Sequence, residues 1–122
     1  MRDKVTALIV TYRRPELLRR AILSILGQTY KNIQVSIFDD ASNDETQKVV
    51  ESLSEVDDRI KYYCHSKNIG ALANFRYAFE SVQTPYFSIL SDDDCLAFDL
   101  YESAINVLDN NPEVMFLSLI HI

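Results

Sequence analysis

The chain has 122 residues, of which 48% are hydrophobic and 25% charged, the composition of an ordinary folded domain. Its 18 acidic and 12 basic residues give a net charge of −6, which argues against a broad basic surface for nucleic acid. Two glycines, Gly27 and Gly70, are too few for a Walker loop or a GxGxxG dinucleotide turn.

Short apolar runs alternate along the chain with stretches of helical periodicity. The runs predict strands over residues 5–10, 33–38, 60–64, 86–90 and 114–120. The first helix is expected to begin at Pro15, where the missing N–H does no harm, and to end at Gly27. The second is expected to open with Ser42 and Glu45, which have the spacing of a capping box. Its predicted apolar face consists of Val49, Val50, Leu53 and Val56.

Two further helices are predicted. The third begins near Gly70 and is expected to bury Leu72, Phe75, Phe79 and Val82. The fourth ends near Pro112 and has the apolar face Tyr101, Ala104, Ile105 and Leu108. This alternation predicts an α/β fold, a Rossmann-like parallel sheet with helices on both faces. Such sheets bind ligands beyond the carboxyl ends of their strands, so the residues after each strand are the candidates for function.

Three consecutive carboxylates, Asp92, Asp93 and Asp94, follow the predicted strand at 86–90. Carboxylate oxygens suit a hard divalent cation such as Mg²⁺ or Mn²⁺, and a substrate diphosphate can supply the remaining ligands. A solvated acidic turn or a helix N-cap is the plainer alternative. The position at a strand end favours a metal or ligand role.

Other polar residues follow the first three strands. Asp39 and Asp40 either accept a hydrogen bond from a nucleotide base or ribose, or cap the following helix. Tyr12 offers a ring for stacking on a base. The candidate phosphate partners, each also a common kind of surface charge, are Arg13, Arg14, Lys67 and Arg76.

Four segments share the order and spacing of one known family. They are residues 5–30 (VTALIVTYRRPELLRRAILSILGQTY), 38–46 (FDDASNDET), 68–70 (NIG) and 86–94 (YFSILSDDD). Together they resemble the N-terminal, nucleotide-sugar-binding half of a family 2 glycosyltransferase with the GT-A fold. Two departures are the triplet beginning after Ser91, one place later than is common, and Ala41 where the family usually has glycine.

The resemblance implies roles for individual residues. Thr11, Tyr12 and Asp40 would hold the nucleotide base, and Asp92 would approach the ribose or the metal. Arg13 and Arg76 would join the nucleotide site, with Arg76 near the phosphates. Asp93 and Asp94 are assigned to the metal site, with Mn²⁺ or Mg²⁺ bridging the donor's diphosphate.

The implied reaction is transfer of a sugar from a UDP-, dTDP- or GDP-sugar to a saccharide or lipid-linked acceptor, with inversion, as in the assembly of cell-surface polysaccharides. The resemblance also implies that residues 1–122 are the donor-binding part of a longer domain, truncated at the C-terminal side. The general base and the acceptor site would lie beyond residue 122, so this chain is expected to have little transferase activity alone. The apolar residues 114–122 would be an internal strand, and its exposure is expected to promote self-association.

Cys64 and Cys95 match no metal-binding spacing and are interpreted as reduced thiols. The expected location is the cytoplasm, either free or peripheral at the inner face of the membrane.

Two other functions remain as alternatives. A non-catalytic module that binds a nucleotide sugar would have the same donor site. A phospho-acceptor receiver domain fits the length, but it would have an acidic pair after the first strand, where this chain has Thr11 and Tyr12.

Overall fold

The computed structural model describes residues 3–114, which form one parallel sheet and its covering helices. In chain order the elements are β1 (Val5–Thr11), α1 (Pro15–Leu26), β2 (Ile33–Asp39), α2 (Thr46–Ser54), β3 (Ile60–Cys64), α3 (Ala71–Glu80), β4 (Tyr86–Ser91) and α4 (Leu100–Asn110). The strands are ordered β3-β2-β1-β4, and all three pairings are parallel. No helix in the described part of the chain is long and apolar enough to cross a membrane.

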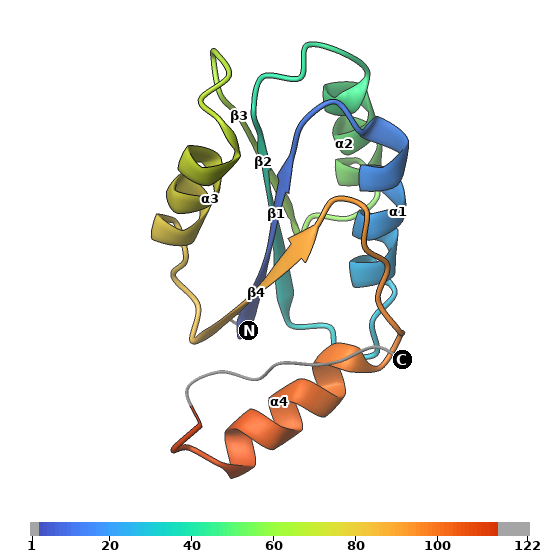
Figure 1. Cartoon of the computed structure of the whole chain (residues 1–122). Coiled ribbons are helices and arrows are strands. Elements are labelled where there is room, and N and C mark those ends of the chain that lie inside the picture. The colour runs from blue at the N-terminus through green and yellow to red at the C-terminus, as the bar shows by residue number, and fades with distance from the viewer. Residues whose placement is uncertain (1–2, 115–122) are drawn as a thin grey trace.

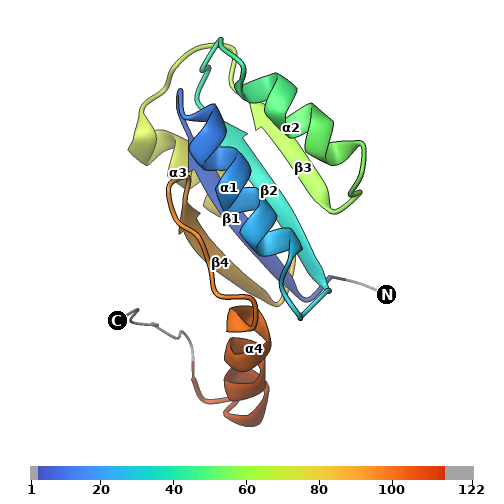
Figure 2. The same cartoon turned by 90° about the vertical axis from the view of Figure 1, so that its right-hand side faces the viewer.

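Helices cover both faces of the sheet, which confirms the predicted α/β class. Helices α1 and α2 lie on one face and α3 lies on the other (Figure 1). Turned by 90°, the molecule shows α1 and α2 in front of the strands, with α4 at the end of the sheet where β1 begins (Figure 2). Contacts of Asp109 in α4 with Lys4 and Tyr86, which flank the starts of β1 and β4, hold α4 at that end.

The main hydrophobic core lies between the sheet and helices α1, α2 and α4. Strands β1 and β2 are buried along almost their whole length, as expected of central strands in a sheet covered on both faces. Helix α1 buries Leu18, Ala21, Ile22 and Ile25 at helical spacing, as its sequence predicts. A smaller cluster of Leu8, Phe38 and Ala78 lies on the α3 face.

Helix α2 begins later than the sequence predicts, and the capping-box expectation is wrong. The residue before the helix is Glu45, whose side chain makes no capping hydrogen bond, and the first helical N–H, that of Thr46, donates to Asp44 Oδ1 at 2.9 Å. The Ser42 side chain is hydrogen-bonded to Asp39 and to the backbone N–H of Arg13 instead. The expected burial of Val56 is also wrong, because Val56 lies beyond the helix and is 82% exposed.

Helix α3 turns a different face to the sheet from the one that its apolar residues indicate. Leu72 is 82% exposed and Phe79 is also exposed, whereas Asn74 and Ala78 are buried. The Asn74 amide donates to the carbonyl of Phe38 and pairs with the His65 ring at 2.9 Å. These polar contacts determine which face of α3 meets the sheet, and apolar periodicity alone does not reveal that orientation.

The last predicted strand lies almost entirely outside the described residues. Of residues 114–120, only Val114 is described, and its N–H closes a turn to the carbonyl of Asn111.

Gln28, just after α1, joins that helix to the segment leading into α4. Its side chain is fully buried. Its Nε2 donates to the carbonyls of Ser24 at 3.0 Å and Ala97 at 2.6 Å, and its Oε1 accepts from the N–H of Tyr101 at 3.1 Å. One amide therefore satisfies three backbone groups that would otherwise be left without a partner.

Gln28→Ala should lower the free energy of unfolding by about 2–3 kcal/mol, because it removes the partner of one buried N–H and of two partly buried carbonyls. Urea unfolding followed by circular dichroism measures this. Gln47→Ala is the matched control, since Gln47 bonds only the exposed Glu51 and should cost less than about 0.5 kcal/mol. Equal effects of the two substitutions would show that the buried amide is not a structural connection.

Candidate functional site

The candidate residues gather at the carboxyl ends of the strands. Thr11, Asp39 and Ser91 are the last residues of β1, β2 and β4. Thr11 lies beside Asp39, and Val10 lies beside Ser91, in the register of the sheet. The connections that follow these strands therefore meet at one edge.

Asp92 is the buried member of the acidic triplet, with its side chain 8% exposed. The Thr11 hydroxyl donates to its Oδ2 at 2.9 Å, which joins β1 to the turn after β4. Arg14 Nη1 lies 3.4 Å from its Oδ1. The structure therefore brings together Thr11 and Asp92, two of the residues assigned to the nucleotide.

Asp93 is half-exposed beside Asp92 and faces the same arginine. Arg14 Nη1 lies 3.4 Å from Asp93 Oδ2, the Ser91 hydroxyl donates to Oδ1 at 2.7 Å, and Arg20 Nη2 donates to the Asp93 carbonyl at 3.3 Å. The Ser91 hydrogen bond, helped by the charges of Arg14 and Arg20, holds the pKa of Asp93 below its usual value. Asp93 is thus held in its ionised form, the form that ligates a cation.

Asp94 points back into its own turn, where its Oδ2 accepts from the N–H of Ser91 at 3.2 Å. Within residues 3–114, no three acidic, histidine or cysteine side chains are gathered closely enough to hold a metal ion by themselves. Asp92 and Asp93 nevertheless already share a cationic group, the Arg14 guanidinium. Two carboxylates facing a cation fit Mg²⁺ or Mn²⁺ whose other ligands come from a diphosphate.

Asp39 organises the turns around the site. Its Oδ1 accepts from the N–H and the hydroxyl of Ser42, at 3.0 and 2.6 Å, and its Oδ2 accepts from the hydroxyl of Tyr62 on β3. Burial, together with this hydrogen bond, raises the pKa of Tyr62. Since Ser42 Oγ also accepts from the N–H of Arg13 at 2.8 Å, one carboxylate connects the turns after β1 and β2.

Asp40 is buried and holds the loop that leads into α3. Its carboxylate accepts from the N–H of Ile69 at 2.7 Å and of Gly70 at 3.0 Å, and its own N–H donates to the carbonyl of Thr11. The side chain of Asn68 donates to the Asp40 carbonyl. The segment Asn68–Gly70 is therefore placed by Asp40, beside the end of β1.

Tyr12 and Arg13 lie on the exposed rim of this edge. The Arg13 guanidinium lies over the Tyr12 ring, 5.0 Å from its centroid. Arg76 is different: it is exposed on α3, and no hydrogen bond or ion pair among the described residues joins it to the acidic triplet.

Three non-glycine residues at this edge have a left-handed backbone conformation, with φ of 55° at Arg13, 61° at Ala41 and 53° at Asn43. Asparagine tolerates this conformation, but alanine is strained in it by about 1–2 kcal/mol. Such strain persists where surrounding contacts impose it, and it commonly marks functional sites. Here the Asp39–Ser42 hydrogen bonds impose it.

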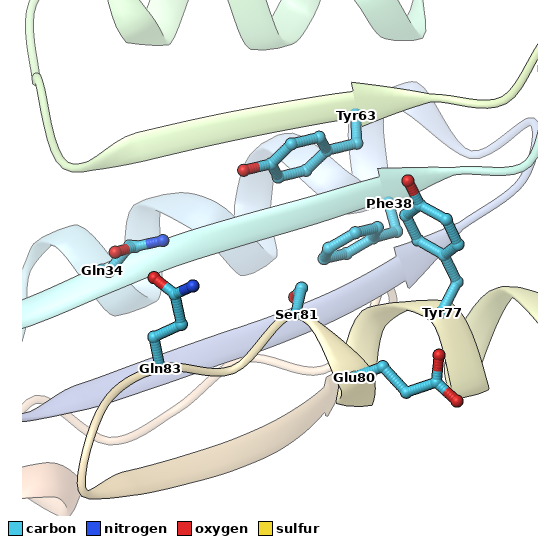
Figure 3. A pocket seen from close by; sticks show the side chains of 7 residues that line it. All are labelled: Gln34, Phe38, Tyr63, Tyr77, Glu80, Ser81 and Gln83. Atoms are coloured by element: carbon cyan, nitrogen blue, oxygen red, sulfur yellow. The ribbon is translucent and has the colours of Figure 1, made fainter.

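A groove of about 410 Å³ lies on the α3 face, away from the acidic turn. Figure 3 shows Tyr63, Phe38 and Tyr77 converging there from β3, β2 and α3. Phe38 stacks on Tyr63 and meets Tyr77 edge-on. None of the residues that the sequence marks as candidates lines this groove.

Sequence reasoning left Ser42, Tyr62 and Arg20 out of the site. Ser42 was assigned to a helix cap, Tyr62 belongs to no motif, and Arg20 lies within the segment 5–30 but was given no role. In the register of the sheet Tyr62 lies beside Ile37, and Cys64 lies beside Asp39. Because alternate residues share a face, Tyr62 and Asp39 are diagonal neighbours on the same face, and strand alternation could have indicated this pair. Arg20 gives no signal until α1 is placed against the turn after β4.

A parallel sheet with acidic residues beyond the ends of β2 and β4 is the arrangement in which α/β proteins commonly bind ligands at their strand ends. The family model for glycosyl transferase family 2 matches residues 6–121. The chain therefore belongs to glycosyltransferase family 2, which confirms the resemblance in the sequence and argues against a receiver domain.

Two curated relatives show the extent of the similarity. A GalNAc(5)-diNAcBac-PP-undecaprenol beta-1,3-glucosyltransferase of Campylobacter jejuni is 32% identical over 106 residues, covering 86% of this chain and 33% of the relative. An uncharacterized glycosyltransferase of Haemophilus influenzae is 30% identical over 111 residues, covering 91% of this chain and 44% of the relative. The chain spans less than half the length of these relatives.

Solved structures share the fold. Staphylococcus aureus TarS 1-349 in complex with UDP aligns with a TM-score of 0.82 and 19% identity, over 89% of this chain and 33% of TarS 1-349. The mannosyltransferase PcManGT from Pyrobaculum calidifontis, in complex with GDP-Man and Mn²⁺, aligns with a TM-score of 0.79 and 22% identity, over 88% and 33%. The sheet described here is thus the GT-A architecture.

Ala41→Gly should raise the free energy of unfolding by about 0.5–1 kcal/mol, because relief of the left-handed strain exceeds the entropy that glycine adds to the unfolded chain. Thermal unfolding measures the gain. Asn43→Gly, at almost the same φ, is the control and should give little or no gain, since asparagine already accepts this conformation. A larger gain at Asn43 than at Ala41 would contradict this explanation.

Proposed function

We propose that this chain binds a nucleotide-diphosphate sugar together with a divalent cation and serves in the transfer of the sugar to an acceptor, with inversion. The observation that carries the proposal is the pair Asp92 and Asp93, held at the strand ends with a cationic group between them. Family membership gives the reaction class. The UDP of TarS and the GDP-Man and Mn²⁺ of PcManGT support a UDP-, dTDP- or GDP-sugar and Mn²⁺ or Mg²⁺ here.

In this proposal Asp92 and Asp93 hold the cation, and Asp94 keeps their turn in shape through its bond to Ser91. A bound divalent cation would stabilise the negative charge that develops on the diphosphate leaving group. Thr11 fixes the orientation of Asp92 by donating to one of its oxygens. The remaining metal ligands come from the donor.

The nucleotide would lie along the edge from Tyr12 to Asp40. Tyr12 presents an exposed ring for stacking on the base. Asp40 already accepts two backbone N–H groups, but a carboxylate has about four acceptor positions, which leaves room for a base N–H. Arg13 lies on the exposed rim of this edge, where it would meet the phosphates, and the family resemblance gives Arg76 of α3 the same role.

We assign the general base and the acceptor site to a part of the protein that corresponds to the region of the relatives outside the match with this chain. The acceptor is a saccharide or a lipid-linked saccharide, as the name of the Campylobacter relative suggests. We place the protein in the cytoplasm or at the inner face of the membrane, where free thiols such as Cys64 and Cys95 persist.

Calorimetric titration of UDP, dTDP and GDP, with and without Mn²⁺, tests the donor site. At least one nucleotide should bind in a Mn²⁺-dependent way, and Asp93→Ala should weaken that binding by roughly tenfold or more, since each metal-bound carboxylate is a main source of affinity. Asp58→Ala removes the same charge from an exposed position and should change nothing. Nucleotide binding that depends neither on Mn²⁺ nor on Asp93 would refute the proposed site.

A measurement of sugar transfer distinguishes the donor-binding part of a transferase from a non-catalytic binding module. If the general base lies outside this chain, the chain alone should bind donor but transfer its sugar far more slowly than a longer protein containing it. A radiolabelled-donor assay with a lipid-linked acceptor compares the two. Equal rates would contradict our placement of the base, and a longer protein that binds donor without transferring it would favour the non-catalytic alternative.

A further inference from the structure

Arg14 has an unusual place in the site, because a single nitrogen serves both carboxylates. Its Nη1 lies 3.4 Å from Asp92 Oδ1 and 3.4 Å from Asp93 Oδ2. Arg14 directly precedes α1, and its side chain is 50% exposed. The half-exposed guanidinium thus contacts both of the carboxylates that the proposed function gives to the metal.

A divalent cation and this guanidinium cannot both stay between Asp92 and Asp93. Two positive groups a few ångströms apart repel strongly in a partly buried site, and the carboxylate oxygens are needed as metal ligands. Arg14 must therefore leave when the cation enters. A half-exposed side chain on a long flexible stem can do so without unfolding anything around it.

The turn that holds the carboxylates does not depend on Arg14. Thr11 still donates to Asp92, Ser91 still donates to Asp93, and Arg20 still donates to the Asp93 carbonyl. Displacement of Arg14 therefore releases its guanidinium while the acidic turn stays in place.

The displaced guanidinium needs a new anionic partner, and the donor brings one. Guanidinium groups bind phosphate oxygens well, often through two parallel hydrogen bonds. A diphosphate bound to a cation at Asp92 and Asp93 would present its oxygens within a few ångströms of the place that Arg14 vacates.

We propose that Arg14 is a positioning residue that couples the divalent cation to the nucleotide. It neutralises Asp92 and Asp93 before the donor arrives, and it passes to the donor's diphosphate when the cation takes its place. Arg14 consequently weakens binding of the cation alone and strengthens binding of cation and nucleotide together. This inference rests on the proposed function, and it adds a reason why the cation enters with the nucleotide and not before it.

The test measures Mn²⁺ affinity by the electron paramagnetic resonance signal of the free ion, without nucleotide and with saturating UDP or GDP, whichever binds. Arg14→Gln should bind Mn²⁺ alone more tightly than the wild type and the Mn²⁺–nucleotide pair less tightly. The factor by which nucleotide enhances Mn²⁺ binding should fall by roughly fivefold or more, within the usual range of coupling between two sites. Arg14→Lys keeps the charge and should retain weak binding of Mn²⁺ alone.

Arg19→Gln is the matched control, because Arg19 lies on α1, the helix that Arg14 precedes, and pairs with the exposed Glu16. It removes the same charge and should behave as the wild type. Circular dichroism confirms that each variant is folded.

Unchanged or weaker Mn²⁺ binding in Arg14→Gln, or an unchanged enhancement by nucleotide, would overturn the role of Arg14 and leave the proposed function intact. Absence of both Mn²⁺ and nucleotide binding in every protein, the control included, would overturn the proposed function as well. Opposite changes in the two affinities, seen in Arg14→Gln and not in Arg19→Gln, would support the coupling, because loss of a surface charge alone moves both in the same direction.

Discussion

Three buried carboxylates at one edge of the sheet set the shape of everything around them. Asp39, Asp40 and Asp92 are almost completely buried, and burying a charge is costly unless hydrogen bonds or an opposite charge surround it. The loops are built to supply the donors: Ser42 and Tyr62 to Asp39, the N–H groups of residues 69–70 to Asp40, and Thr11 to Asp92. The left-handed backbone at Ala41 and Arg13 is the conformation that lets these donors reach.

The donors differ in a way that determines what the edge can bind. Asp39 and Asp40 accept hydrogen bonds from neutral hydroxyl and backbone N–H groups in the described part of the chain, and neutral donors do not cancel the charge of a carboxylate. Among the acidic residues at this edge in residues 3–114, only Asp92 and Asp93 form ion pairs with arginine. The edge as a whole therefore remains negative, and a bare diphosphate would meet repulsion there. A nucleotide diphosphate that arrives with a divalent cation would not, so the electrostatics of the loops and the chemistry of the proposed donor are consistent.

Apolar patterning was sufficient for β1, β2 and α1, because these elements are buried by hydrophobic contact and their periodicity is the cause of their placement. The rule that ligands bind at strand ends pointed to Thr11, Asp40 and Asp92, which the structure places at one edge of the sheet. The predictions that failed share another cause. The Ser42 side chain bonds Asp39 in place of capping α2, and Asn74 occupies the buried face of α3 in place of Leu72. Each position is decided by a polar partner, Asp39 three residues before Ser42 and Phe38 36 residues before Asn74, and apolar periodicity does not reveal such partners.

The contacts that Thr11 and Arg14 make with the acidic turn differ in how easily they can be exchanged. Thr11 is buried, its side chain is short, and its hydroxyl meets Asp92 at 2.9 Å, so this contact resists both water and competing ions. Arg14 reaches the carboxylates at 3.4 Å from a half-exposed side chain, in a geometry that water screens and that adds little stability. A site that must accept a cation needs carboxylates that stay where they are and a counter-charge that leaves. The turn after β4 has both: a hydroxyl that fixes the oxygens and a guanidinium that solvent or a ligand can replace.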